Sequence, residues 1–110
     1  LMLTEEGQKQ EELPKAIMCM ASKVGLERCR QQVRAMMVRQ DNREMLTSIS
    51  CPTLLICGEE DVLTPPEIHR EMEENIPNAR FELITGCGHL TPLEAPERLN
   101  DLMLEWLEKP

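Results

Sequence analysis

Two side chains in this sequence have the types and the setting that acid–base chemistry needs. Asp61 lies in the segment 58–65 and His89 in the segment 86–92, and each segment directly follows a short apolar run. If these runs are neighbouring parallel strands, about 4.8 Å apart, the two segments meet at the carboxyl edge of a sheet, where α/β proteins bind ligands. The carboxylate of Asp61 can then accept the Nδ1 proton of His89, as in two of the three members of a hydrolytic triad.

Each of the two residues also has a plain structural interpretation. Acidic loop residues such as Asp61 often stabilise turns, and the neighbouring Glu59 and Glu60 show that this loop tolerates acids for solvation. His89 could be a hydrogen-bonded loop histidine, although the two glycines just before it indicate an unusual backbone path. The second histidine, His69, has charged neighbours and is expected to be an ordinary surface residue.

The second half of the chain has the pattern of a unit that could position this pair. The short apolar run 53–57, between a proline and a glycine, predicts a strand buried on both faces. Thr64, Pro65 and Glu67 predict a helix N-terminus with Thr64 as the N-cap. The predicted order is strand Thr53–Cys57, a helix to about Asn75 that buries Ile68 and Met72, strand Phe81–Ile84, and a helix from Pro96 to Leu107. This order predicts a right-handed, parallel β-α-β-α unit.

The first half of the chain is predicted to be helical. Apolar residues recur at three- and four-residue spacing over 13–24 and again over 26–40, with Gly25 between the two stripes. Met36 and Met37 could line an apolar pocket, but methionine at this spacing more often packs in a core. Asp41 and Glu44 predict a capping box that opens a short helix to about Ser48. The polar residues 1–10 are expected to be loosely ordered.

Composition and charge exclude several classes of protein. The net charge is −8, and it divides into +1 for residues 1–50, with eight basic and seven acidic residues, and −9 for residues 51–110, with four basic and thirteen acidic residues. Nucleic-acid binding, which needs a clustered basic surface, is therefore not expected. No apolar run approaches the roughly 20 residues of a membrane span, and we expect no membrane partner. Five cysteines with no metal-ligand spacing favour free thiols, a cytoplasmic location and no metal site.

Two segments together resemble the α/β-hydrolase family. The segment 51–65, Cys-Pro-Thr-Leu-Leu-Ile-Cys-Gly-x-x-Asp-x-x-Thr-Pro, resembles the family's seventh-strand segment. The segment 86–97, Gly-Cys-Gly-His-Leu-x-x-x-Glu-x-Pro-Glu, resembles its eighth-strand segment, and the spacing of 28 residues between Asp61 and His89 suits one helix and one strand. The resemblance implies a three-layer α/β fold in which Asp61 is the triad acid and His89 the general base. It also implies a cap-like helical segment over residues 1–40 and a core segment over residues 41–110.

The sequence departs from this family at the nucleophile. The family presents its nucleophile on a G-x-S-x-G elbow, earlier in the chain than the acid and the base. The serines of this sequence are Ser22, Ser48 and Ser50, and none has elbow glycines; Cys87 lies two residues before His89 and cannot fill that position. We therefore interpret the chain as the carboxyl-terminal portion of a longer hydrolase, inactive by itself. Its first residue, Leu1, fits this interpretation.

The implied activity is hydrolysis of a small ester-like or related acyl substrate, with no cofactor. C–C bond hydrolysis, dehalogenation, epoxide hydrolysis and peroxide formation on the same fold remain open, because they differ in the nucleophile and the cap. A non-catalytic module that binds a partner or itself also remains open. Two parallel strands are too few for an independent sheet, so we expect a homo-oligomer or pairing with the rest of a hydrolase core.

Overall fold

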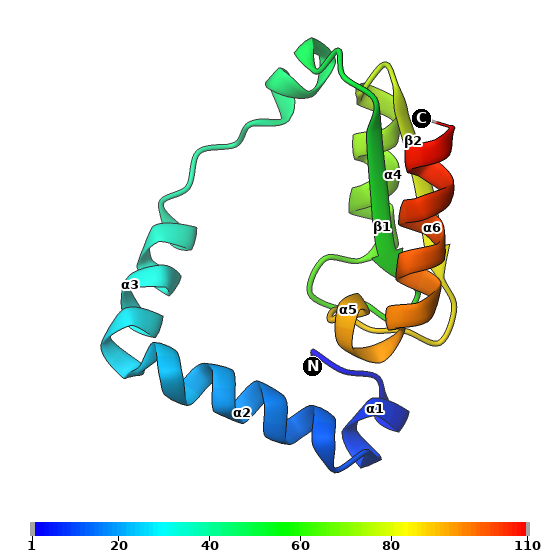
Figure 1. The fold of residues 1–110 in the computed structure, drawn as a ribbon. Helices are drawn as coiled ribbons and strands as arrows, with labels where there is room; N and C mark the ends of the chain where they lie inside the picture. Colours follow the sequence, from blue (N-terminus) through cyan, green and yellow to red (C-terminus); the bar gives the residue numbers. More distant parts are fainter. Residues whose placement is uncertain (1, 110) are drawn as a thin grey trace.

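The structure is a computed structural model that describes residues 2–109. A compact body and a helical arm make up the chain (Figure 1). In chain order, the elements are α1 (Glu5–Lys9), α2 (Glu12–Val24), α3 (Leu26–Met37), the 3₁₀-helix η1 (Arg43–Ser48), β1 (Thr53–Gly58), α4 (Pro66–Asn75), β2 (Ala79–Ile84), α5 (Thr91–Glu94) and α6 (Pro96–Glu108).

The body is the predicted β-α-β-α unit. Strands β1 and β2 pair in parallel, in a register that runs from Thr53 opposite Ala79 to Gly58 opposite Ile84. Helices α4 and α6 cover opposite faces of this sheet, which gives three layers (Figure 1). The expectation of a three-layer α/β unit is confirmed, and each strand extends one or two residues beyond its predicted bounds.

Alternation along the strands explains how both faces of the sheet are covered. Phe81 lies opposite Leu55, so the two side chains share a face, and the ring of Phe81 stacks on His69 of α4 with 5.9 Å between ring centroids. On the other face, Ile84 forms a buried cluster with Leu102 of α6. Because both faces of β1 are covered, a continuous apolar run suits this strand better than an alternating one.

Three local expectations are wrong: the loose order of residues 1–10, the capping box at Asp41, and Thr64 as the N-cap of α4. Residues 4–9 are ordered, because the Thr4 side chain accepts the Gly7 N–H and caps α1. The 41–48 segment forms a 3₁₀-helix whose N-cap is Asn42 and not Asp41; the Asp41 side chain accepts the backbone N–H of Arg43 and also pairs with the Arg43 side chain, and no capping box with Glu44 forms. Helix α4 begins at Pro66 with Pro65 as N-cap, because the Thr64 side chain is bonded elsewhere.

The arm, residues 12–42, leaves the body beside α1 and returns at η1 (Figure 1). The two predicted helices are present, but Met36 and Met37 are not in a core, since they are 73% and 81% exposed; of the two, Met36 lines a pocket, as the alternative interpretation allowed. Other large apolar side chains on the arm are also exposed, namely Met18, Met20, Leu26, Val33 and Val38. The arm therefore carries apolar surface that nothing in residues 2–109 covers. The boundary between a cap-like segment and a core segment at residue 40 stays a prediction.

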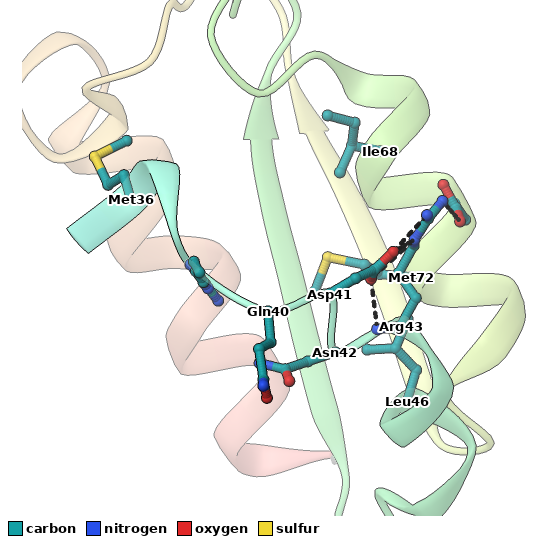
Figure 2. A pocket seen from close by; sticks show the side chains of 10 residues that line it. Met36, Gln40, Asp41, Asn42, Arg43, Leu46, Ile68 and Met72 are labelled. Carbon is teal, nitrogen blue, oxygen red and sulfur yellow. Dashed lines mark hydrogen bonds and ion pairs between the residues drawn. The ribbon is translucent and has the colours of Figure 1, made fainter. Parts of the chain in front are cut away.

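A cavity of about 410 Å³ lies where the returning arm approaches α4 (Figure 2). Ile68 and Met72 line this cavity, and the prediction that α4 buries both is wrong: Ile68 is 44% exposed and Met72 is half-buried. Arg43 bridges the cavity rim through ion pairs with Asp41 and with Glu71 of α4. Hydrogen bonds and charge from Arg43 lower the pKa of Asp41 to about 2. Neither Asp61 nor His89 lines this cavity.

Candidate active site

Asp61 is held in the loop after β1 by hydrogen bonds from that loop. Its side chain is only 5% exposed. Oδ1 accepts the backbone N–H groups of Leu63, at 2.9 Å, and of Thr64, at 3.0 Å, while Oδ2 accepts the Thr64 hydroxyl at 2.8 Å. The interpretation of Asp61 as a turn residue is thus correct for Oδ1, which orders the loop. The other oxygen serves a partner outside the loop.

That partner is His89, in the loop after β2. Its Nδ1 lies 2.9 Å from Oδ2 of Asp61, so the expected contact between the two sequence-predicted residues is present. Because Nδ1 faces a carboxylate, the tautomer with the proton on Nδ1 is favoured, and Nε2 is the basic nitrogen. The side chain is 31% exposed, which leaves the ring partly open to solvent. The arrangement is chemically able to accept a proton at Nε2 and to stabilise the resulting imidazolium.

The electrostatics keep Asp61 ionised. Burial by itself raises the pKa of this carboxyl group, but hydrogen bonds outweigh burial. The donors are the Thr64 backbone, His89, the Thr64 hydroxyl and the Leu63 backbone, and together they lower the pKa from 3.8 to about 2. A carboxylate that stays charged at neutral pH is the partner that a protonating imidazole needs.

The two loops are adjacent because backbone hydrogen bonds join them directly. The Glu59 N–H donates to the Ile84 carbonyl and the Glu60 N–H donates to the Cys87 carbonyl, both at 2.9 Å. These bonds extend the parallel ladder past the end of β1. The close approach depends on Gly58, since a Cβ there would lie 2.2 Å from the Gly88 carbonyl oxygen and 2.3 Å from that of Cys87.

We expect Gly58→Ala to separate the two loops. The atoms that a new methyl group would meet belong to the backbone, so the loops must move apart and the Asp61–His89 contact must lengthen. The expected loss in the free energy of unfolding is about 1–3 kcal/mol, as for overpacking in a core. Urea unfolding measures this loss, and Gly25→Ala is the comparison, because a Cβ there meets nothing within 4 Å and its cost comes only from the positive φ of 78°. Unchanged stability of Gly58→Ala would contradict the close approach.

Thr64 is a site residue that the sequence reasoning missed. Its hydroxyl donates to Oδ2 of Asp61 and lies 3.4 Å from Nδ1 of His89. The Thr-Pro-Pro pattern favoured a capping role for Thr64. The spacing of three residues from Asp61 was the only signal that its side chain could bond that carboxylate. A hydroxyl at this point holds Oδ2 in the direction of the imidazole.

No nucleophile lies at the imidazole within residues 2–109. The three serines are exposed, and the Ser48 hydroxyl donates to the Met45 carbonyl. Cys57 and Cys87 are buried, and burial, the largest effect, together with nearby carboxylates raises the pKa of each thiol to about 11. Such thiols are protonated at neutral pH and are poor nucleophiles. Over the same residues, no cluster of three or more His, Cys, Asp or Glu side chains could hold a metal ion.

The fold and the acid–base pair together define a class of protein. A family model described as alpha/beta hydrolase fold matches residues 10–96, and this chain belongs to that family. A proline iminopeptidase from Lactobacillus delbrueckii subsp. bulgaricus is 34% identical over 64 residues, which is 58% of this chain and 21% of that protein. A bifunctional epoxide hydrolase 2 from Sus scrofa is 37% identical over 60 residues, which is 54% of this chain and 11% of that protein.

The solved structures agree with this assignment. A thermophilic esterase from Thermogutta terrifontis matches with a TM-score of 0.63 and 42% identity, over 66% of this chain and 26% of the esterase chain. The chain therefore spans about a quarter or less of the lengths of the proteins it matches. No helix in the described part of the chain has both the length and the apolar character that a membrane span requires.

Proposed function

We propose that Asp61 and His89 are the acid and the general base of a serine-type hydrolase that acts on a small ester-like or related acyl substrate. This segment would form the carboxyl-terminal part of a longer chain, whose earlier part supplies the nucleophile. The observation that carries the proposal is the 2.9 Å contact between Nδ1 of His89 and the buried carboxylate of Asp61. The likeness to the esterase supports the acyl substrate.

The mechanism follows from the geometry of the pair. Nε2 of His89 takes the proton of the attacking nucleophile and later gives it to the leaving group. Asp61 accepts the hydrogen bond from Nδ1–H throughout, stays ionised, and stabilises the imidazolium between these two steps. Thr64 and the loop N–H groups keep Asp61 in place for both steps. The proposal invokes no metal and no organic cofactor.

A chimeric esterase tests the proposal. Residues 41–110 of this chain replace the matching segment of the Thermogutta terrifontis esterase, which then supplies the nucleophile and the oxyanion hole. We expect this chimera to hydrolyse p-nitrophenyl acetate and to form an acyl-enzyme. A folded chimera that forms no acyl-enzyme, while the unaltered esterase does, would contradict the assignment of Asp61 and His89. The coding sequence upstream of Leu1 gives an independent check, because the proposal requires an elbow there.

The 110-residue chain alone is expected to give no acyl-enzyme. Its described residues place neither a nucleophile nor an oxyanion hole at His89, and an acid–base pair alone offers no covalent route. Turnover of p-nitrophenyl acetate should not exceed that of an equal concentration of free imidazole. A stoichiometric burst of p-nitrophenol would contradict this expectation and would point to one of the cysteines.

The other chemistries of the fold remain a second candidate for the same pair. The likeness to an epoxide hydrolase favours keeping them, since that relative matches over a similar share of this chain. C–C bond hydrolysis, dehalogenation and peroxide formation use the same acid and base positions. The upstream sequence decides among these, because the chemistries differ in the nucleophile that it would supply.

A third candidate is a non-catalytic module that binds itself or another chain. Strand β1 pairs only with β2 among the described residues, so its other edge presents unpaired backbone groups, and the arm separately exposes apolar side chains. We expect the isolated chain to form homo-oligomers through this edge, or to pair there with the earlier part of a hydrolase core. Light scattering at tens of micromolar tests this: a cooperatively folded monomer of 12.6 kDa would contradict it.

The five free cysteines suit a cytoplasmic location for either candidate.

A further inference from the structure

Glu94, at the end of α5, binds the loop that carries His89. Its Oε2 accepts the Gly88 N–H at 2.9 Å. Its Oε1 accepts both the backbone N–H of Thr4, at 2.7 Å, and the Thr4 hydroxyl, at 2.8 Å. One carboxylate thus joins α5, the His89 loop and the start of the chain, and three donors converge on it.

The backbone around Glu94 leaves no room for a side chain at Gly88 or at Gly7. A Cβ at Gly88 would lie 2.8 Å from Oε2 of Glu94 and 3.1 Å from the Thr4 nitrogen. A Cβ at Gly7 would lie 2.5 Å from Oε1. Two glycines from distant parts of the sequence therefore allow the backbone to approach the same carboxylate. This close approach distinguishes Glu94 from a solvated surface acid.

These contacts act on the two peptide groups that lead into His89. The Gly88 N–H that donates to Glu94 belongs to the Cys87–Gly88 peptide, and the next peptide, Gly88–His89, is held by the His89 N–H, which donates to the Met2 carbonyl at 3.1 Å. Gly86 and Gly88 would otherwise leave this loop with many accessible conformations. Without the anchor, the imidazole loses the backbone position that brings Nδ1 to Asp61.

We propose that Glu94 is a positioning residue for His89: it holds the Cys87–Gly88 peptide directly and holds residues 2–4, whose Met2 carbonyl accepts the His89 N–H, so that the imidazole stays bonded to Asp61. The proposal rests on the proposed function of the Asp61–His89 pair and adds a residue that touches neither substrate nor the imidazole itself. Glu94 acts through Gly88, and its effect is to be read at the His89 side chain.

The test uses the 110-residue chain labelled with ¹⁵N at histidine. The chain has only two histidines, so long-range ¹H–¹⁵N spectra give one signal set for His89 and an internal reference for His69, which stacks on Phe81. In the neutral form we expect His89 to carry its proton almost entirely on Nδ1. In Glu94→Ala and Glu94→Gln we expect a shift to the Nε2–H tautomer that free histidine prefers, with His69 unmoved. The amide of the Gln variant has one acceptor oxygen for three donors.

Two further variants make each outcome decisive. Glu97→Gln, an exposed acid in the first turn of α6, should leave the His89 signals unchanged. Asp61→Asn should shift them; if it does not, the acid–base pair and hence the proposed function fail. If Asp61→Asn shifts the signals and both Glu94 variants keep the Nδ1–H tautomer, only the positioning role is overturned. Loss of cooperative folding in both Glu94 variants would also overturn it, because Glu94 would then be a general structural residue.

Discussion

Replacing His89 with alanine in the chimeric esterase is expected to abolish turnover. The variant lacks the only group at the site that can take the proton of the nucleophile, so kcat should fall by a factor on the order of 10⁴ or more. Folding should be nearly unchanged, because the side chain is partly exposed in a loop and its loss opens no core cavity. Steady-state hydrolysis of p-nitrophenyl acetate measures the first effect, and thermal unfolding measures the second.

The matched control for this substitution is His69→Ala. His69 is the second histidine of the chain, and it lies on α4 against the ring of Phe81. Its removal is expected to lower stability slightly and to leave kcat within about twofold of the parent chimera, because it has no contact with Asp61 or His89. Retained turnover in His89→Ala would return His89 to a structural role. Equal losses in both variants would indicate a general effect on folding.

Asp61→Asn is expected to lower kcat by a factor on the order of 10⁴, with a smaller change in KM. An asparagine side chain can present its amide N–H groups to Nδ1, which favours the tautomer with the proton on Nε2 and removes the basic nitrogen from the reaction. It also offers a neutral group to the imidazolium. The pH dependence of kcat distinguishes this change at the imidazole from a loss of folded enzyme. Partial unfolding would lower kcat equally at every pH and leave the shape of the pH profile unchanged.

The same change is expected to lower stability at neutral pH. The folded-state pKa of Asp61, about 2, lies below its reference value of 3.8, so the ionised carboxylate stabilises the fold. This contribution, on the order of 2 kcal/mol, is fully present above about pH 4 and is lost as the pH falls toward 2. Urea unfolding of the 110-residue chain should therefore show a smaller difference between Asp61→Asn and the parent near pH 2 than at pH 7. Glu60→Gln, an exposed neighbour, is the control and should show neither effect.

Much of the body could be predicted because its signals are local. The run Thr53–Cys57 is buried on the face of Leu55 and Cys57 and half-buried on the face of Leu54 and Ile56, and it shows as a continuous apolar segment; a helix opened by prolines follows it. Two successive parallel strands bring their carboxyl ends together, so the contact between Asp61 and His89 followed from topology alone. The catalytic roles of this pair came from the family resemblance and stay a prediction.

The misses all involve interactions that sequence spacing does not reveal. Thr64 stands before two prolines, which is typical of a helix N-cap. Its hydroxyl, however, bonds the buried carboxylate of Asp61 and not the first turn of α4. Thr4 is ordered through Glu94, 90 residues later, and nothing within residues 1–10 indicates that partner. Met36 and Met37 follow a core-like stripe, yet the surface that would cover them is not among the described residues.

The bond between Thr4 and Glu94 closes the chain into a ring, in which the arm is an excursion between two points fixed on the body (Figure 1). For such a closed segment, the entropic cost grows only with the logarithm of its length, by about 0.6 kcal/mol for each doubling. Lengthening the arm by ten or twenty residues would therefore change the free energy of closing the ring by a few tenths of a kcal/mol. The stability of the His89 loop therefore depends little on the length of the arm. The arm can be lengthened or shortened while the acid–base pair keeps its geometry.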